Sequence, residues 1–372
     1  MAIVIRPYGL EHIPAVQAFN RRLREGGAPP YLQFPEHPVP RWLPRRAGND
    51  RTYNEFFLAL EGDAVRGTYG IKHQDFYFAD GAVRSVGLYH HPFSEGIVNK
   101  AYNTVAIHMT REAIRYCPLL YALGMGGYDQ PLPRMLKLLG WSDCLVPFYF
   151  RVLRPARFLR NVGILRTNRW RRLLADIGAF SGAGAIAIAL AQRWAAHGAP
   201  RAEPMRVKPV PHFSEWADML WERNKNHHAL VAVRDRAALN VLFPPENHAF
   251  LRLEVERSGS PVGWAVVSDA RKNPKYGDMK VGTILDCFAA PGDALMVVRA
   301  AAQALEERGV DLIVSNQSYG AWRRAFRHAG FLEGPSNFIF AASKELSRLI
   351  SPLDPATIQF NRSDGDGLYQ YV

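Results

Sequence analysis

Two adjacent histidines, His90 and His91, are the residues best suited to acid–base chemistry. They follow an apolar run, Val83 to Tyr89, that is typical of a strand. An imidazole titrates near neutral pH, so either ring could take a proton from a nucleophile. Glu95 lies just beyond the pair and could relay such a proton or simply cap the helix expected after it. A polar strand end without chemistry is the alternative for the histidines.

A second candidate group lies in the other half of the chain. Asp286 interrupts the apolar run Ile284 to Phe288, and a carboxylate there must be paired, exposed on a sheet face, or functional. Asn316, Ser318 and Tyr319 follow a short buried run, at the strand end where ligands commonly bind in open α/β sheets. These residues are candidates for lining a substrate or cofactor pocket. Alternatively, Asn316 and Ser318 only cap the next helix.

Each candidate group lies in one half of the chain, and the two halves share the same predicted order of strands and helices. In the first half, apolar periodicity and turn signals predict strands at 2–6, 56–60, 65–78, 83–89, 119–125 and 145–153, with helices at 10–25, 97–116 and 132–139. In the second half they predict strands at 207–210, 250–255, 262–268, 280–288, 312–315 and 337–342, with helices at 214–223, 293–308 and 321–328. This is a structural repeat without obvious residue identity.

The length of 372 residues is too great for one ordinary core, so two domains are expected. We predict a mixed α/β fold of two similar domains joined by a basic helical linker. The predicted boundaries are 1–153 for the first domain, 154–204 for the linker, 205–350 for the second domain and 351–372 for the tail. In the tail, Asp364 to Gly367 resembles half a calcium loop, but a turn is the better interpretation.

Composition excludes several classes of protein. Only 22% of the residues are charged and 48% are hydrophobic, which is globular rather than disordered composition. Cys117, Cys144 and Cys287 are odd in number and form no CxxC pair, so we expect neither a disulfide framework nor a metal site. The first residues lack the pattern of a signal peptide, which favours a cytoplasmic protein. The common nucleotide-binding and hydrolase motifs are also absent.

Each half ends on a short helix followed by glycine and an aromatic residue, Gly140-Trp141 and Gly330-Phe331. On these marks the chain resembles the GNAT superfamily of acyl-CoA N-acyltransferases, twice over. The segment Tyr89 to Leu123 further resembles tandem GNAT-like proteins associated with bacterial polysaccharide or cell-envelope synthesis. The resemblance implies transfer of an acyl group from acyl-CoA, with acetyl-CoA as the expected donor, to a small amine such as an amino sugar or other envelope precursor.

In such proteins the central strands part after a bulge, and the cofactor's pyrophosphate meets the N-terminus of the next helix. The resemblance therefore assigns cofactor binding to Ser94, Gly96, Ile97, Asn316 and Ser318. The candidate catalytic residues are His90, His91, Glu95, Asp286 and Tyr319.

This sequence also departs from the family pattern. Glu95 stands where phosphate would approach, and the second-half loop Ala290 to Asp293 is also acidic. The tyrosine that often protonates the departing thiolate is replaced by Leu136 or Leu138 in the first half and by Phe326 in the second. A catalytically inactive tandem scaffold is therefore a second hypothesis.

The net charge of +12 favours an anionic partner. Arginines are concentrated from Arg151 to Arg172 with no acidic residue before Asp176, and the uncharged apolar stretch 177–191 follows. That stretch is shorter than the roughly 20 residues that span a bilayer, so we expect it to lie on the inner face of the plasma membrane or to pack between the domains. Binding of tRNA, as in aminoacyl-tRNA-dependent transferases, is a third hypothesis.

Overall fold

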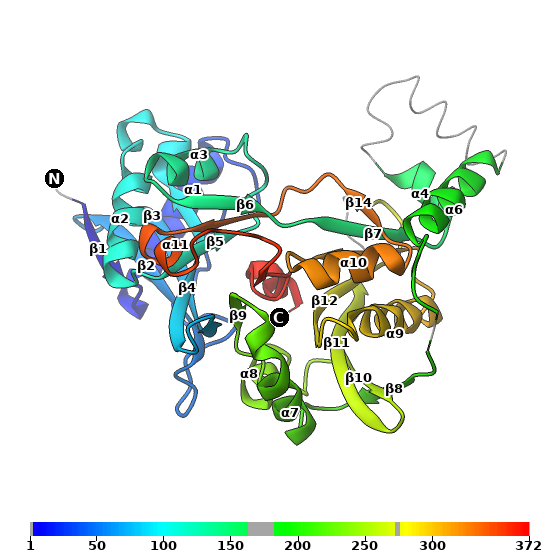
Figure 1. The fold of residues 1–372 in the computed structure, drawn as a ribbon. Coiled ribbons are helices and arrows are strands. Elements are labelled where there is room, and N and C mark those ends of the chain that lie inside the picture. Colours follow the sequence, from blue (N-terminus) through cyan, green and yellow to red (C-terminus); the bar gives the residue numbers. More distant parts are fainter. Residues whose placement is uncertain (1–2, 163–181, 202, 272–275, 372) are drawn as a thin grey trace.

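The computed structural model describes residues 3–162, 182–201, 203–271 and 276–371. It contains two mixed sheets with helices on both faces, one sheet formed mainly by each half of the chain (Figure 1). The prediction of a mixed α/β fold with two similar halves is thereby confirmed.

The first sheet is built on three long antiparallel strands that alternate their side chains between two cores. Phe56 and Leu58 pack against α1 (Ile13–Glu25), whereas Phe57 and Ala59 pack against α2 (Val105–Tyr116). This is the period of two expected for a strand covered on both faces. The strands are β1 (Val4–Pro7), β2 (Thr52–Glu61), β3 (Ala64–Phe78), β4 (Val83–Ser94) and β5 (Leu120–Leu123), and α3 (Pro131–Leu138) lies on the α2 face.

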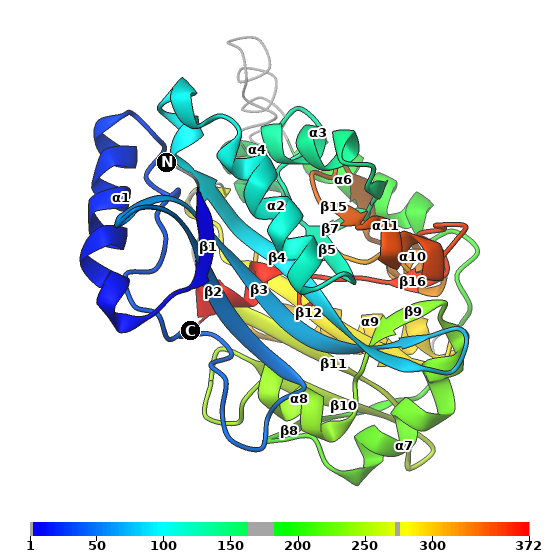
Figure 2. The ribbon, with the colours of Figure 1, turned by 90° about the vertical axis from the view of Figure 1, so that its left-hand side faces the viewer.

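The second sheet repeats this plan (Figure 2). Trp264 and Val266 face one helix pair, and Ala265 and Val267 face the other. The strands are β8 (Arg206–Val210), β10 (Leu251–Arg257), β11 (Ser260–Arg271), β12 (Val281–Ala289) and β13 (Leu312–Asn316). The helices are α7 (Glu215–Asn224) and α8 (Arg236–Leu242) on the first face, and α9 (Ala294–Glu307) and α10 (Gly320–His328) on the second.

The two halves exchange their last strands. The first half ends in β6 (Ser142–Leu145) and β7 (Phe148–Val152), and the second in β14 (Leu332–Gly334) and β15 (Ile339–Ala342). β7 pairs with β13 in the second sheet, and β15 lies between β5 and β6 in the first. The single strand predicted over 145–153 is therefore wrong, because Pro147, which has no N–H to donate, separates two strands of different sheets.

The helix predicted at 97–116 begins later, at Val105. Residues 95–97 and 100–102 form two short 3-10 turns instead. Each turn has its own cap, because Ser94 Oγ accepts a hydrogen bond from the Gly96 N–H and Asn99 Oδ1 accepts one from the Ala101 N–H. Local side-chain caps of this kind favour turns over a continuous helix.

The described part of the predicted linker contains two short helices, α4 (Pro155–Asn161) and α6 (Ala183–Ala195). Arg166, Arg169, Arg171 and Arg172 and the start of the predicted apolar stretch lie outside the described residues. Within the described ranges, the structure contains no helix long and apolar enough to cross a membrane.

The end of the chain lies between the two halves (Figure 1). After α11 (Lys344–Leu349), the short strand β16 (Ile358–Gln359) runs parallel to β9 (Leu230–Ala232), and β9 extends the first sheet beside β3. The turn predicted at Asp364 to Gly367 lies earlier, at residues 362–365, and a 3-10 helix covers Asp366–Tyr371. Among the described residues, no cluster of His, Cys, Asp and Glu could hold a metal ion. We call residues 358–366 the C-terminal segment.

Candidate active site

In the first sheet, β4 and β5 part soon after they begin to pair. Only Gly87 and Leu88 of β4 have partners on β5, yet β4 continues to Ser94. The register of β4 against β3 also shifts between Thr68 and Gly70, which marks a bulge. A bulge bends its strand, so the end of β4 leaves the plane that it shares with β5. We call residues 89–94 of β4, together with the end of β5, the first wedge.

The bulge brings His90 and His91 together within the first wedge. Successive side chains on a regular strand point to opposite faces. His91 instead has a φ of +50°, in the left-handed region that non-glycine residues rarely adopt. As a result, His90 Nδ1 lies 2.8 Å from His91 Nδ1, and His90 Nε2 lies 3.0 Å from Asn54 Oδ1.

The hydrogen bonds determine which ring nitrogen carries each proton. Asn54 Nδ2 donates to the Trp42 carbonyl, so Asn54 Oδ1 is the atom that faces His90 and must accept from His90 Nε2–H. Neutral His90 then accepts at Nδ1 from His91 Nδ1–H. Neutral His91 consequently presents the lone pair of its Nε2, the atom needed for a general base.

Burial keeps this pair neutral. His90 is only 4% exposed, and burial lowers its pKa well below the ordinary value of 6.5. Burial also lowers the pKa of His91, although the carboxylate of Asp366 opposes that shift. Asp366 Oδ2 lies 3.9 Å from His91 Nε2, where its negative charge would stabilise a proton gained by the ring.

The other predicted residues of the first half lie at the end of the first wedge. Ser94 caps the first 3-10 turn, and Ile97 is exposed. Gly96 packs so closely that an added Cβ would lie 2.7 Å from the Tyr102 carbonyl oxygen. Glu95 is buried and forms ion pairs of 3.0 Å with both Arg22 and Arg66. The negative charge expected opposite a phosphate is therefore paired with two guanidinium groups.

The second sheet has an opening of the same kind. β12 pairs with β13 only from Val281 to Thr283, and its register against β11 shifts between Val266 and Val267. We call residues 284–289 of β12, together with the end of β13 and residues 317–318, the second wedge. In the second wedge, most of the predicted site residues form hydrogen bonds with the C-terminal segment.

Asp286, Asn316 and Ser318 all bind the C-terminal segment. Both oxygens of Asp286 accept hydrogen bonds, from Asn361 Nδ2 and Ser363 Oγ, each at 2.6 Å. Ser318 Oγ accepts from the Phe360 N–H and donates to the Ile358 carbonyl, and Asn316 Oδ1 accepts from Arg362 Nε. Tyr319 lies apart from this group and donates to the His227 carbonyl.

Sequence reasoning missed two buried cations between the halves. Arg234 is fully buried and forms ion pairs with Asp286 at 2.8 Å and Asp364 at 2.6 Å. Lys72 on β3 is also fully buried, and its Nζ donates to the carbonyls of Ser363 and Asp364. Burial lowers the pKa of Lys72 to about 7. Asp286 was recognisable as a single charge in an apolar strand, whereas Lys72 and Arg234 are followed by other polar residues and gave no such signal.

At the positions where the family often has a proton-donating tyrosine, this chain has side chains that cannot donate a proton. Leu136 and Phe326 are buried in the two cores, and Leu138 is exposed to solvent. Protonation of a departing thiolate therefore falls to water or to a group outside these positions.

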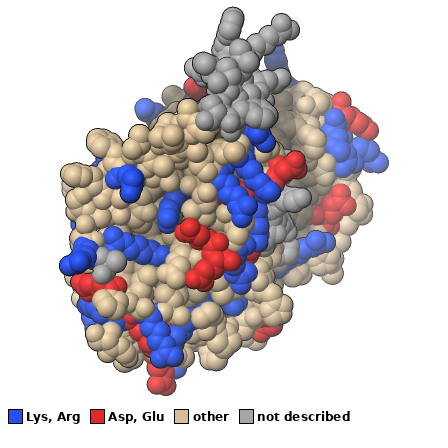
Figure 3. All heavy atoms as spheres, turned by 90° about the vertical axis from the view of Figure 1, so that its right-hand side faces the viewer, with Lys and Arg blue, Asp and Glu red and all other residues tan. Residues whose placement is uncertain are grey.

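Several arginines of the predicted basic linker are paired. Arg154 and Arg157 both reach the buried carboxylate of Asp311 at 3.2 Å, and Arg151 lies 3.6 Å from Glu306. On the side of the molecule that carries α4 and α6, Lys and Arg side chains are interspersed with Asp and Glu (Figure 3). The described arginines therefore do not form a uniformly basic surface.

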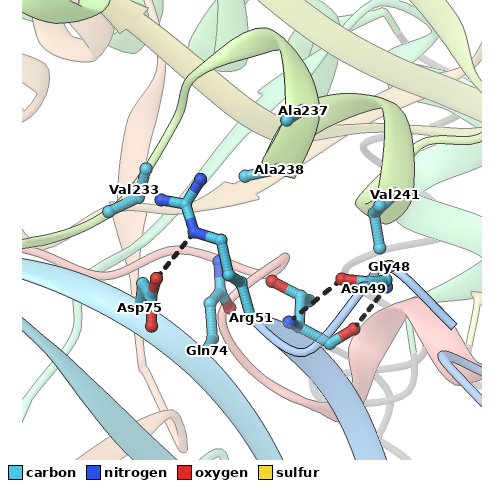
Figure 4. Close-up of a pocket in the computed structure, with 10 residues that line it drawn as sticks. Gly48, Asn49, Arg51, Gln74, Asp75, Val233, Ala237, Ala238 and Val241 are labelled. Carbon is cyan, nitrogen blue, oxygen red and sulfur yellow. Dashed lines mark hydrogen bonds and ion pairs between the residues drawn. The ribbon is translucent and has the colours of Figure 1, made fainter. Parts of the chain in front are cut away.

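A cavity of about 100 Å³ lies elsewhere, between the first sheet and α8 (Figure 4). Arg51 bridges the halves at its rim through Asp75 at 2.7 Å and Asp235 at 3.1 Å. The buried amide of Gln74 lines the cavity and has no hydrogen-bond partner among the described residues. Gln74 is four positions along β3 from Gly70, the partner of His90, which corresponds to about 13 Å. The cavity is thus separate from the first wedge.

Comparison with known proteins shows similarity in structure alone. No protein-family model matches the chain, and no curated protein matches its sequence. A probable N-acyltransferase from Enterococcus faecalis V583 aligns over 93% of this chain and 74% of its own, with a TM-score of 0.51 and 11% identity. A GCN5-related N-acetyltransferase from Anabaena variabilis aligns over 91% and 72%, with a TM-score of 0.50 and 9% identity. The chain thus has, over both of its halves, the fold of GNAT-type N-acyltransferases.

Proposed function

We propose that this protein is an acyl-CoA-dependent N-acyltransferase whose reaction takes place at the first wedge. The observation that carries the proposal is the hydrogen-bonded pair of His90 and His91, which a bulge places beside the parting strands β4 and β5. In this arrangement His91 is the general base and His90 a positioning residue.

The proposed step transfers the acyl group directly. The amine nitrogen of the acceptor attacks the thioester carbonyl carbon, so a C–N bond forms and the C–S bond breaks. The amine proton goes to His91 Nε2, the thiolate of CoA leaves and takes a proton from a water molecule, and the hydroxide so formed recovers the proton from His91. Asp366 stabilises the imidazolium formed at His91, while Asn54 and His90 hold the ring in the tautomer that accepts at Nε2.

The surroundings of the first wedge favour an anionic cofactor. The first turn of α2 carries no acidic residue, and the partial positive charge of a helix N-terminus attracts phosphate. Arg22 and Arg66 compensate Glu95, the one acidic residue of the preceding turn. Arg66 also pairs with Glu61 at 3.0 Å, so the two guanidinium groups and the two carboxylates balance, and the attraction for phosphate rests on the N-terminus of α2.

We propose acetyl-CoA as the acyl donor and an amino sugar or other cell-envelope precursor as the acceptor. The resemblance of the segment Tyr89 to Leu123 to tandem proteins of envelope synthesis supports this choice. The acceptor amine must be neutral to attack, and it becomes acidic as the C–N bond forms, so a neutral imidazole can take the proton at that stage.

Calorimetric titration with acetyl-CoA, followed by a thiol-release assay against a panel of amino sugars, tests the proposal. We expect micromolar to millimolar binding and CoA release that depends on one acceptor. Absence of binding at millimolar acetyl-CoA would contradict the proposal.

One observation favours a second candidate, a catalytically inactive protein that binds an anionic membrane surface. Ile186, Leu190 and Trp194 recur every four residues along α6, and each is more than half exposed. An exposed apolar stripe beside arginines suits a helix that lies in a membrane interface. Co-sedimentation with vesicles containing anionic lipid, without any acetyl transfer, is the result that this candidate predicts. Peripheral attachment to the inner face of the plasma membrane would follow from it.

A further inference from the structure

The two wedges differ in what lies between their strands. Wherever two strands part, their facing N–H and C=O groups lose their ladder partners and must be satisfied by a ligand, by water or by another part of the chain. In the second wedge, the C-terminal segment satisfies them on both sides.

On the β12 side, the Cys287 carbonyl accepts a hydrogen bond of 3.1 Å from Gln359 Nε2. On the β13 side, the Ser318 N–H donates to the Phe360 carbonyl at 3.1 Å, and Gln317 forms an antiparallel bridge with Asn361. The C-terminal segment therefore contacts residues 317–318 through backbone hydrogen bonds and β12 through the side-chain amide of Gln359, as an extended ligand with amide groups would.

Side chains of the second half also hold the C-terminal segment in place. Gln359 Oε1 accepts from Trp322 Nε1 of α10, and Gln359 is fully buried. Asn361, Ser363 and Asp364 are fully buried as well, and they are held by Asp286 and Arg234. Such a buried polar network is costly to open, because its paired groups would lose their partners.

In the first half the same segment makes a different kind of contact. Its carbonyls at Ser363 and Asp364 accept hydrogen bonds from Lys72 Nζ, and Asp364 accepts another from Tyr121 Oη. These donors are side chains on one face of the sheet, and the segment meets the first wedge at its rim, where Asp366 lies near His91.

We infer that the second wedge is a peptide-binding site occupied by the chain's own residues 358–364. This occupant takes the place of a pantetheine arm, so the protein binds one acyl-CoA, in the first half only. The statement about acyl-CoA rests on the proposed function; the occupancy of the second wedge does not.

Hydrogen–deuterium exchange on the full chain separates the two statements. Without ligand, we expect the amides of Phe360 and Asn361 to exchange as slowly as those of β13, because both donate to buried acceptors. Exchange within seconds would overturn the inference, whether or not acyl-CoA binds.

With saturating acetyl-CoA, we expect new protection in residues 89–105 and unchanged exchange in 284–294 and 358–364, at a calorimetric stoichiometry of one. Faster exchange of 358–364, new protection in 284–294, or a stoichiometry of two would overturn the inference. Absence of binding with slow exchange of 358–364 would contradict the proposed function and support the occupancy.

A matched pair of serine variants completes the test. Ser318→Ala removes both the acceptor for the Phe360 N–H and the donor to the Ile358 carbonyl, so exchange in 358–364 should rise at least about tenfold, as expected for loss of two buried hydrogen bonds. Ser347→Ala removes a side-chain hydrogen bond within the α11 region and should leave those amides unchanged. Equal behaviour of the two variants would contradict the inference.

Discussion

His90 Nδ1 lies 2.8 Å from His91 Nδ1, although neighbouring side chains on a strand normally point to opposite faces. The left-handed backbone of His91 produces this contact. Strain of this kind costs on the order of 1–3 kcal/mol and persists where the surrounding structure fixes it, often at functional sites. Here it directs His91 Nε2 toward Asp366 at the rim of the first wedge.

Replacement of His91 should remove the base. We expect His91→Gln to lower kcat about 10²-fold or more while the KM for acetyl-CoA changes little, because the ring acts on the acceptor amine. His212→Gln, at an exposed histidine of the second half, is the matched control and should keep full activity. Similar kcat values for the two variants would exclude His91 as the base.

The tautomer argument makes a separate prediction for Asn54. In Asn54→Asp, a carboxylate still accepts from His90 Nε2–H but no longer donates to the Trp42 carbonyl. A buried negative charge beside His90 should raise the pKa of that ring and so shift the acid side of the pH–rate profile to higher pH. The profile of kcat/KM against pH measures this, and an unchanged profile would contradict the proposed chain of hydrogen bonds.

Activity and stability should both fall with acid. Burial lowers the pKa of His90 and His91, so below pH 6.5 the unfolded chain binds protons that the native state excludes. The free energy of unfolding must therefore decrease as the pH falls from 6.5 toward the lowered values. Because the base is neutral His91, the acid side of the kcat profile at saturating acceptor should also lie below pH 6.5. An activity loss centred above pH 7 would contradict this assignment.

Lys72 should extend the same rise of stability with pH into the alkaline range. Its pKa is lowered from 10.5 to about 7, so between these values the unfolded chain again binds the extra proton. The free energy of unfolding should rise with pH in that window, by up to about 1.4 kcal/mol per pH unit. Urea unfolding of Lys72→Met from pH 7 to 9 should lack this rise, whereas Lys137→Met, at an exposed lysine, should retain it. Parallel curves for all three proteins would show that Lys72 titrates normally.

Glu95 should contribute more to the free energy of unfolding than expected for an acidic residue in a loop. Glu95→Gln leaves Arg22 and Arg66 without their shared buried carboxylate, and loss of one partner of a buried ion pair costs about 3 kcal/mol. Glu112→Gln breaks only the exposed pair with Arg115 and should cost less than about 1 kcal/mol. Urea unfolding compares the two, and equal losses would contradict the structural role of Glu95.

The sequence predicted the parts of the fold that depend on local pattern. Alternation along residues 56–78 identified the meander, and the helix-then-glycine endings at Gly140 and Gly330 identified the repeat. It placed His90 and His91 just after a strand at 83–89, whereas β4 continues to Ser94, and it did not show their contact, because the bulge depends on the register of β4 against β3.

Sequence patterns could not show which residues far apart in the chain are in contact. The strands β6 and β7 read as one final strand, since nothing local indicates that they belong to different sheets. Lys72 and Ser363 are 291 positions apart, and the turn at Asp364 gave no sign that it fills an opening beside Asp286. The predicted cofactor residues Asn316 and Ser318 were placed at the correct strand end, but they bind the chain itself.

Photoaffinity labelling with an acyl-CoA that carries a diazirine in its acyl chain tests the central claim most directly. Peptide mapping should place the label within residues 87–105 and 120–128, on both sides of the first wedge, and excess acetyl-CoA should suppress it. Competed label within residues 281–294 and 312–320, or no competed label at all, would contradict the claim that the first wedge holds the acyl donor.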